Sequence, residues 1–415
     1  MRPLLRADAA APDPAPRARS AVATRDRDRT TLFEIFFDLV FVFALTRVVA
    51  LVEADPEPAS LLRATILLAL LWWAWCAFIW LGNQVRLDRG FVRVGMLVAM
   101  AGVFVVGLVI PEAWTRHPDG ANPALVLAVA FAVVRGCYVI LLAAAAWGRP
   151  RLRRQLILDL APQTVSIGLL VAGAVLGGTW QAGLWAAALV VDFAGGRSAA
   201  RYRGWRVGSP RHFTERHDLV LIIALGETVL ASGARVDPWS SNPSALGVVL
   251  VGFLITASLW WAFFGRLSAE AARALEHADH AARPSLARDG YTFGHFPLVA
   301  GVVLVAIGST LLLDDVVADP GEPASRLAVA ALGAGIVLYL VGLEIFRWIL
   351  LRDRCWASLV GAGLVAVAVV SSAWYPAWVF PLVVAAITAT AATVVGRHAP
   401  GSGETPVRHC PAADQ

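Results

Sequence analysis

Apolar runs of about twenty residues recur along the whole chain, and they constrain its fold more than any other feature. A transmembrane helix needs about 20 mostly apolar residues, and by that criterion the sequence predicts about twelve spans. The first six cover 32–52, 61–81, 92–110, 123–147, 156–176 and 180–194. The second six cover 218–234, 244–264, 292–313, 326–346, 353–373 and 377–396. We therefore expect an all-α, polytopic integral membrane protein.

Arginine is concentrated in every second loop between these runs. The chain has no lysine, and only 16% of its residues are charged, against roughly 25% in soluble domains. Cytoplasmic loops of membrane proteins carry the arginine excess, so the arginine-rich loops and both termini are predicted to be cytoplasmic. The intervening loops are poor in arginine and often acidic. This alternation indicates a lipid bilayer, rather than nucleic acid, as the partner of the basic residues.

An internal repeat divides the chain into two halves. Asp38–Ala50 resembles Asp218–Ala231, and the next span of each half carries Leu-Trp-Trp-Ala, at Leu71–Ala74 and Leu259–Ala262. Two matches in the same order indicate duplication. An even number of spans per unit predicts two parallel six-helix repeats related by an axis along the membrane normal. The expected domains are a disordered cytoplasmic tail (1–31), the first repeat (32–206), the second repeat (207–396) and a cytoplasmic tail (397–415).

Charged residues inside the expected spans are the first candidates for function. A charge near the bilayer centre costs at least about 2.5–3.5 kcal/mol, so it usually faces a bundle interior or a water-filled path. Glu34 and Asp38 share one helix face, whereas Arg47 turns to roughly the opposite side. The repeat places Arg47 and Glu227 at equivalent positions, where an ion pair would satisfy both. Arg135, near the middle of the fourth span, is the alternative partner of Glu227.

Acidic residues nearer the ends of spans have simpler interpretations. Asp218 lies at the cytoplasmic start of the seventh expected span, where interaction with the helix dipole and Arg216 competes with a role in a pathway. Asp159, Asp192 and Glu344 lie beside arginine-rich loops, so interfacial ion pairs are expected for them. The candidates for a pathway or an internal ion pair are therefore Glu34, Asp38, Arg47, Arg135, Asp218 and Glu227.

The sequence contains no pattern that indicates catalysis. A phosphate-binding loop, a GxSxG nucleophile motif, an HExxH zinc motif and a complete dinucleotide fingerprint are all absent. His277 and His280 have a spacing that suits a metal, but their segment alternates charges like a solvated helix and offers no third ligand. We expect no enzyme activity, no cofactor and no metal site.

Two segments resemble a known family. The run LFEIFFDLVFVFALTRV, from residue 32, resembles the N-terminal motif of the bacterial low-temperature-requirement A membrane proteins. The run ERHDLVLIIALGETV, 215–229, is similar to that family's second motif, with Gly226 and Glu227 as its Gly-Glu. The resemblance covers 32 to about 396 and implies a bacterial inner (plasma) membrane and a link to growth in the cold. It implies no particular molecular activity.

A second resemblance concerns mechanism. The pattern from Phe36 to Thr46 is similar to the first helix of the two-repeat potassium channels that carry a Phe-Ser-Asp motif. This chain has Phe37 in place of the serine, and its second half has His217 before Asp218. The resemblance therefore supports a pathway for a small ion or solute rather than potassium selectivity.

Two hypotheses follow from these observations. The first is a transporter or channel-like protein with the charged residues near its pathway. The second is a non-transporting membrane protein that supports membrane integrity or an assembly in the cold, with the same charges as internal locks. The two hypotheses differ in whether neutralising Glu227 changes activity while the protein still folds and inserts. The sequence does not indicate the oligomeric state or the substrate.

Overall fold

The structure is a computed structural model that describes residues 30–118, 120–200, 205–233 and 243–398. Within these ranges the chain forms helices and no β-strand. The tails expected at 1–31 and 397–415 lie almost entirely outside the described residues. The helices of the first half are α1 (Leu32–Ala54), α2 (Pro58–Gly82), α3 (Gly90–Val109), α4 (Pro123–Ala145), α5 (Pro150–Leu176) and α6 (Gly178–Ala200).

The second half adds six long helices and a short helical segment that connects two of them. The long helices are α7 (Pro210–Gly233), α8 (Pro243–Phe264), α11 (Phe296–Ala318), α12 (Arg326–Leu351), α13 (Trp356–Ser371) and α14 (Val379–Arg397). The connection consists of α9 (Leu267–His277), α10 (Arg283–Leu286) and a π-helix (Ala287–Gly294). Each of the spans expected from the sequence therefore overlaps one long helix.

Most of these helices have the length and the apolar composition that crossing a membrane requires. Ten described helical stretches are long and apolar enough to cross a membrane, so the protein is multi-pass, and the part that the structure describes is all-helical. Helices α6 and α7 are not among the ten. Helix α7 extends for eight residues before the expected start at 218 and carries five charged residues, namely Arg211, Glu215, Arg216, Asp218 and Glu227.

Local sequence explains several helix starts. Helices α2, α4 and α5 each have proline at the first position, where the missing N–H is not needed. Helix α1 begins with a capping box, in which the Thr31 hydroxyl accepts from the Glu34 amide and the Glu34 carboxylate accepts from the Thr31 amide. Glu34 is therefore first of all a helix cap.

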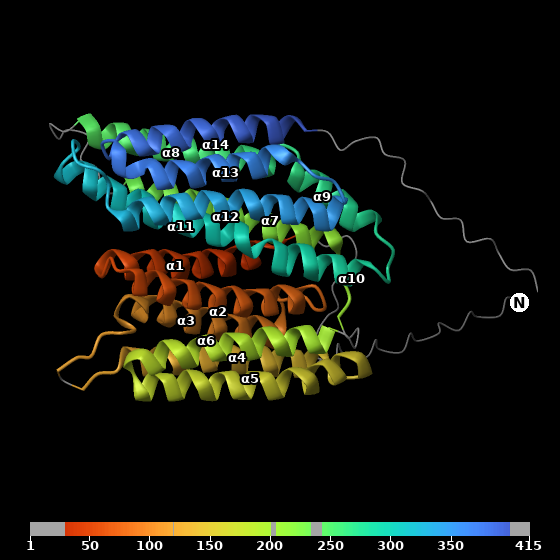
Figure 1. Ribbon diagram of the computed structural model, residues 1–415. Helices are drawn as coiled ribbons and strands as arrows, with labels where there is room; N and C mark the ends of the chain where they lie inside the picture. The colour runs from red at the N-terminus through yellow and green to blue at the C-terminus, as the bar shows by residue number, and fades with distance from the viewer. Residues whose placement is uncertain (1–29, 119, 201–204, 234–242, 399–415) are drawn as a thin grey trace, which may run out of the picture.

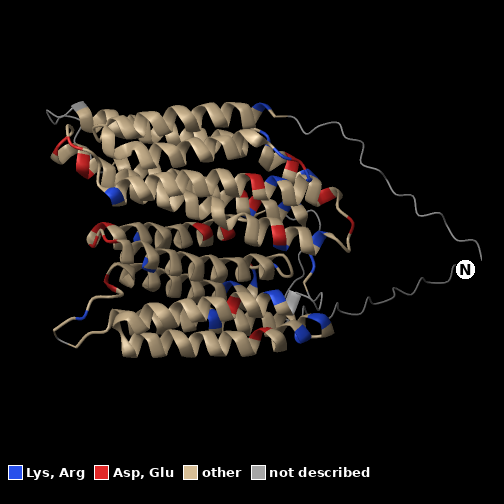
Figure 2. Ribbon diagram, viewed as in Figure 1, with Lys and Arg blue, Asp and Glu red and all other residues tan. Residues whose placement is uncertain are grey.

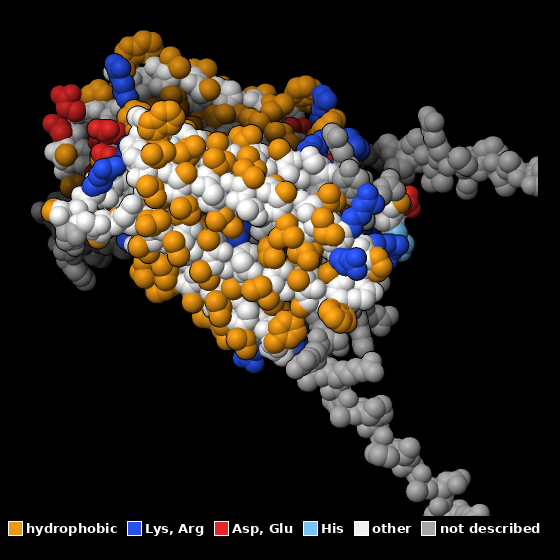
Figure 3. Space-filling model, turned by 90° about the horizontal axis from the view of Figure 1, so that it is seen from below, with side chains coloured by type: hydrophobic (Ala, Val, Ile, Leu, Met, Phe, Trp, Pro, Cys, Tyr) orange, Lys and Arg blue, Asp and Glu red, His pale blue; other side chains and the backbone are white. Residues whose placement is uncertain are grey.

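The two halves lie one above the other, with the helices roughly side by side (Figure 1). Helix α1 contacts α7 and α11 across the junction. Charged residues gather at the two ends of the bundle, and the stretch between the ends is mostly uncharged (Figure 2). We call the end with α9, α10 and the first turn of α5 the arginine-rich end. Between the ends, the surface seen from below carries many hydrophobic side chains, as lipid contact requires (Figure 3).

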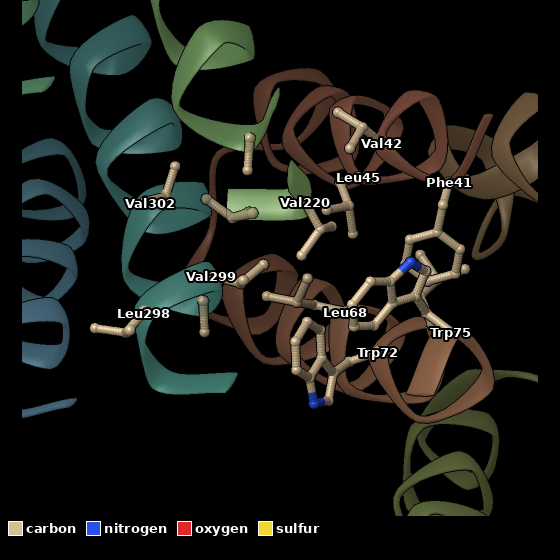
Figure 4. Packing of buried hydrophobic residues seen from close by; sticks show 14 of the residues in the cluster. Phe41, Val42, Leu45, Leu68, Trp72, Trp75, Val220, Leu298, Val299 and Val302 are labelled. Atoms are coloured by element: carbon tan, nitrogen blue, oxygen red, sulfur yellow. The ribbon is translucent and has the colours of Figure 1, made fainter. Parts of the chain in front are cut away.

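The core at the junction comes from four helices that are far apart in sequence. Phe41 and Leu45 of α1 lie opposite Trp72 of α2, Val220 of α7 and Val299 of α11 (Figure 4). All five side chains are buried. Helices α1, α2, α7 and α11 therefore form the centre around which the outer helices pack.

Glycines allow the close approach of α11 to α12. A Cβ added at Gly335 would lie 2.7 Å from the amide nitrogen of Val305 and 2.8 Å from the carbonyl oxygen of Gly301. We expect Gly335→Ala to lower the free energy of unfolding by about 1–3 kcal/mol, because two backbones would have to separate. The melting temperature of purified protein in detergent measures this. Gly363→Ala is the control, because a Cβ there meets nothing, and equal melting of the two variants would contradict the prediction.

Candidate functional site

A closed cluster of charges lies between α1 and α7. Arg216 donates from Nε to Asp38 Oδ2 at 2.7 Å and from Nη2 to Asp38 Oδ1 at 2.6 Å, and both side chains are fully buried. Arg216 Nη1 also lies 3.3 Å from Glu34 Oε1. A bidentate arginine–carboxylate pair is the strong form of such an interaction. The two acidic residues predicted on α1 thus share one arginine from the other half of the chain.

An indole, an imidazole and a backbone amide contact the carboxylates of this cluster as well. The Trp75 indole donates to Asp38 Oδ1 at 2.8 Å, and His212 Nε2 lies 2.9 Å from Glu34 Oε1. The second oxygen of Glu34 accepts from the Thr31 amide at 2.9 Å. Both carboxylates therefore have partners inside the protein, and the cluster joins α1, α2 and α7.

The other sequence candidates have separate surroundings. Asp218 accepts a hydrogen bond from Ser268 at 2.7 Å, and Arg216 pairs with Asp38 instead of with Asp218. Since α7 begins at Pro210, Asp218 is also not at the helix start, and the expected dipole interaction is wrong. Among the described residues no ion pair joins Glu227 to Arg47 or Arg135, and the Arg47 Nε has no hydrogen-bond partner. Equivalent positions in a repeat need not face each other.

The partner of Arg135 is a residue that was expected to form an ion pair at the membrane interface. Arg135 forms an ion pair with Asp192 of α6, and both side chains are buried. Asp192 also accepts from Ser166 of α5 at 3.0 Å. The expectation that Asp192 pairs with an interfacial loop is therefore wrong, because its carboxylate lies at the same depth as Arg135 and faces it.

A cavity of about 650 Å³ extends from the arginine-rich end into the first half of the molecule. Helices α2, α4, α5 and α6, together with α10 and the π-helix, surround it. Arg151 and Gln163 both line it, so it extends along α5 for about 18 Å at about 1.5 Å of rise per residue, more than half of the roughly 30 Å hydrocarbon thickness. The Arg135–Asp192 pair is part of its inner lining.

One face of α5 supplies the polar wall of this cavity. Gln155, Asp159 and Gln163 follow one another at i, i+4 spacing and share that face. Asp159 accepts from Gln155 Nε2 at 2.9 Å and from the Tyr138 hydroxyl at 3.2 Å. This spacing is visible in the sequence, but two of the three residues are uncharged glutamines, so charge alone does not identify the face. Asp159 is consequently a wall residue of the cavity and not a partner of a loop arginine.

Aromatic rings supply much of the opposite wall. Trp73 and Trp80 of α2, Trp205 and Phe293 all line the cavity. Trp80 donates its indole N–H to the Thr292 hydroxyl at 2.9 Å. Thr292 and Phe293 belong to the π-helix, a geometry that is frequent at functional sites.

Arginines lie at the mouth of the cavity. Arg151, Arg206 and Arg288 line it, with Arg151 in the first turn of α5 and Arg288 just after α10, at the arginine-rich end. Arg288 pairs with its neighbour Asp289 at 2.7 Å, whereas Arg151 and Arg206 form no ion pair with any described residue. Positive charge at the entrance of a cleft attracts anions and repels cations.

The far end of α4, α5 and α6 is closed by packing. Trp185 is fully buried, its indole donates to the Leu170 carbonyl at 2.9 Å, and its ring contacts Trp114 with centroids 5.1 Å apart. Gln181 donates to the Ala113 carbonyl at 2.7 Å. None of Trp114, Gln181 and Trp185 is among the residues that line the cavity, so this packed region lies beyond it. In the described part of the chain no three histidine, cysteine or acidic residues are grouped closely enough to hold a metal ion.

Comparison with known proteins identifies a family and a relative. Residues 29–394 match the family model described as bacterial low temperature requirement A protein (LtrA). The chain is also 29% identical over 329 residues to the uncharacterized protein RA0937 of Rhizobium meliloti (strain 1021), covering 76% of each protein. No solved structure gives a significant match.

Proposed function

The chain belongs to the bacterial low-temperature-requirement A family, and we propose that it is a membrane transporter whose substrate binds in the cavity of its first half. The observation that carries this proposal is a polar-lined cavity that reaches mid-helix depth. Ionisable residues at that depth are costly, and they usually mark substrate or ion pathways. Asp159, Asp192 and Arg135 all line this cavity.

The arrangement of the helices supports a transporter built from two repeats. In the first half α1 contacts α2 and α3, and α2 contacts α6; in the second half α7 contacts α8 and α11, and α8 contacts α14. These are the same pairings in the order of the chain, as a duplicated six-helix unit predicts. On this proposal α6 and α7 also cross the membrane, which gives twelve spans. The charges of α7 are tolerated because Arg216 has its partners inside the protein.

The arginine-rich end is the cytoplasmic end on this proposal. Loops with an arginine excess stay on the cytoplasmic side of a bacterial inner membrane. Helix α1 begins and α14 ends at that end (Figure 1). The cavity then opens to the cytoplasm, and the packing of Trp114 and Trp185 closes the other side. A site that opens to one side at a time is typical of an alternating-access transporter rather than an open channel.

The proposed chamber can be tested by chemical labelling. In a background with all four cysteines replaced by alanine, we expect Gln163→Cys to react with a membrane-impermeant maleimide added at the arginine-rich end. Val165→Cys is the matched control, because Val165 lies at almost the same depth but its side chain is 52% exposed on the outside of the bundle. Lipid there keeps the thiol protonated and unreactive.

The transport function has its own measurement. Proteoliposomes with the protein are incubated with a bacterial small-molecule extract, and their contents are compared with those of empty liposomes by mass spectrometry. We expect at least one solute to accumulate, and maleimide labelling of Gln163→Cys to abolish that accumulation. Labelling of Gln163→Cys without any accumulated solute would leave the chamber in place but contradict transport.

A further inference from the structure

We infer that the cavity binds an amphipathic organic anion, a molecule with a negatively charged group on an aromatic or apolar body. The cavity alone supports the binding site, and only the extension to a transported substrate rests on the proposed function. Three features of the lining carry the inference: its charge, its spare hydrogen-bond donors and its aromatic wall.

The charges of the lining favour an anion. The cavity is lined by four arginines and two aspartates, namely Arg135, Arg151, Arg206, Arg288, Asp159 and Asp192. Asp192 is neutralised by the buried Arg135, and both oxygens of Asp159 already accept hydrogen bonds. The positive charge without a described partner therefore lies at the mouth, on Arg151 and Arg206.

Spare hydrogen-bond donors extend this preference into the cavity. The indole N–H groups of Trp73 and Trp205 donate to no described residue, and the Gln163 amide forms no hydrogen bond within the described chain. The Nε of the buried Arg135, a donor, and the Oε1 atoms of Gln155 and Gln163, which are acceptors, also have no partner among the described residues. Buried polar groups are normally hydrogen-bonded, so the Arg135 Nε indicates a ligand that supplies an acceptor, to which the two partly buried indoles can also donate. The side-chain amides of Gln155 and Gln163 can bind either a donor or an acceptor of the same ligand.

The aromatic wall and the size of the cavity describe the rest of the ligand. Trp73, Trp80, Trp205 and Phe293 present ring surface that a charged group alone would not use. A volume of about 650 Å³ falls within the roughly 300–1,000 Å³ of pockets for organic ligands. An inorganic ion would leave most of this space and the ring surface unused. A planar or apolar body that bears a carboxylate or phosphate would contact the aromatic rings and also accept hydrogen bonds from the donors of the lining.

Three size-matched probes test the charge of the ligand. We would use equilibrium dialysis to measure the binding of 1-naphthoate, 1-naphthamide and 1-naphthylmethylammonium to the full chain in nanodiscs of zwitterionic lipid. The binding to empty nanodiscs is subtracted. We expect saturable binding of 1-naphthoate that is at least tenfold tighter than binding of the ammonium compound. Equal or tighter binding of the ammonium compound, or no saturable binding of any probe, would overturn the inference.

A pair of variants places the bound anion in the cavity. We expect Arg151→Gln to weaken 1-naphthoate binding about tenfold, since it removes a charge-assisted hydrogen bond. Arg153→Gln makes the same change of charge two residues away, outside the cavity lining, and is expected to leave binding unchanged. An equal loss in both variants would show a general charge effect and contradict the assigned site.

The lipid composition of the nanodiscs distinguishes two possible sources of the anion. A lipid headgroup and a soluble anion share the same chemistry, so the dialysis is repeated in nanodiscs that contain phosphatidylglycerol. Unchanged 1-naphthoate binding supports a soluble ligand. If phosphatidylglycerol displaces 1-naphthoate from the wild type but not from Arg151→Gln, the same site binds an anionic lipid. If phosphatidylglycerol displaces 1-naphthoate equally from both proteins, the assigned site is wrong. Because dialysis needs no flux, binding without accumulation in proteoliposomes would refute transport and leave the ligand class standing.

Discussion

Replacing Arg216 with glutamine is expected to lower the free energy of unfolding by about 3–5 kcal/mol, because two buried carboxylates lose the guanidinium that they share. Arg216 is fully buried and reaches both Asp38 and Glu34. The cost comes mainly from the carboxylates that remain, and not from the lost attraction itself. The measurement is thermal unfolding of purified protein in detergent, followed by tryptophan fluorescence.

Two comparisons show whether this cost comes from stranded charge. Combining Arg216→Gln with Glu34→Gln and Asp38→Asn removes all three charges, and we expect it to recover a large part of the lost stability. Arg211→Gln is the surface control on the same helix, because its side chain is 57% exposed and its ion pair within the described structure is with Glu215, which predicts a change within about 0.5 kcal/mol. A triple variant no more stable than Arg216→Gln would contradict the electrostatic explanation.

The helices were predictable from hydropathy, because each one must be apolar along most of its length to lie in lipid. Every expected span overlaps a long helix, and most boundaries differ by a few residues. The seventh span shows the limit of that approach. The sequence placed its start at 218, but α7 begins at Pro210 and includes Arg216. A polar turn is stable there because its charge is paired inside the protein, which hydropathy does not record.

Ion-pair partners were not predictable, because they depend on which helices are neighbours. Glu34 and Asp38 were recognised as buried acids, but Arg216 is 178 residues from Asp38 in sequence. Only the contact of α1 with α7 brings them together. The repeat suggested Arg47 and Glu227 as partners by position, but no ion pair between them exists in the described structure. Symmetry of position gives no information about the direction of a side chain.

Replacing Arg135 with glutamine is expected to reduce 1-naphthoate binding and solute accumulation at least tenfold, and also to destabilise the protein. Arg135 is 3% exposed and lines the inner part of the cavity, and its ion pair with Asp192 is equally buried. Its removal takes positive charge from the cavity and strands the Asp192 carboxylate beside Ser166. Both effects follow from one substitution, so lost activity alone would not identify the role of Arg135.

The double variant Arg135→Gln with Asp192→Asn separates the two roles. It removes the stranded charge, so we expect thermal stability to return toward that of the wild type while binding and accumulation stay low. Such a split places Arg135 in ligand binding, because a purely structural residue would lose and regain both properties together. Recovery of binding along with stability would make the pair an internal lock like Arg216 and Asp38. The charges within the bundle would then support the hypothesis of a non-transporting membrane protein, and the mouth arginines alone would have to account for any anion binding.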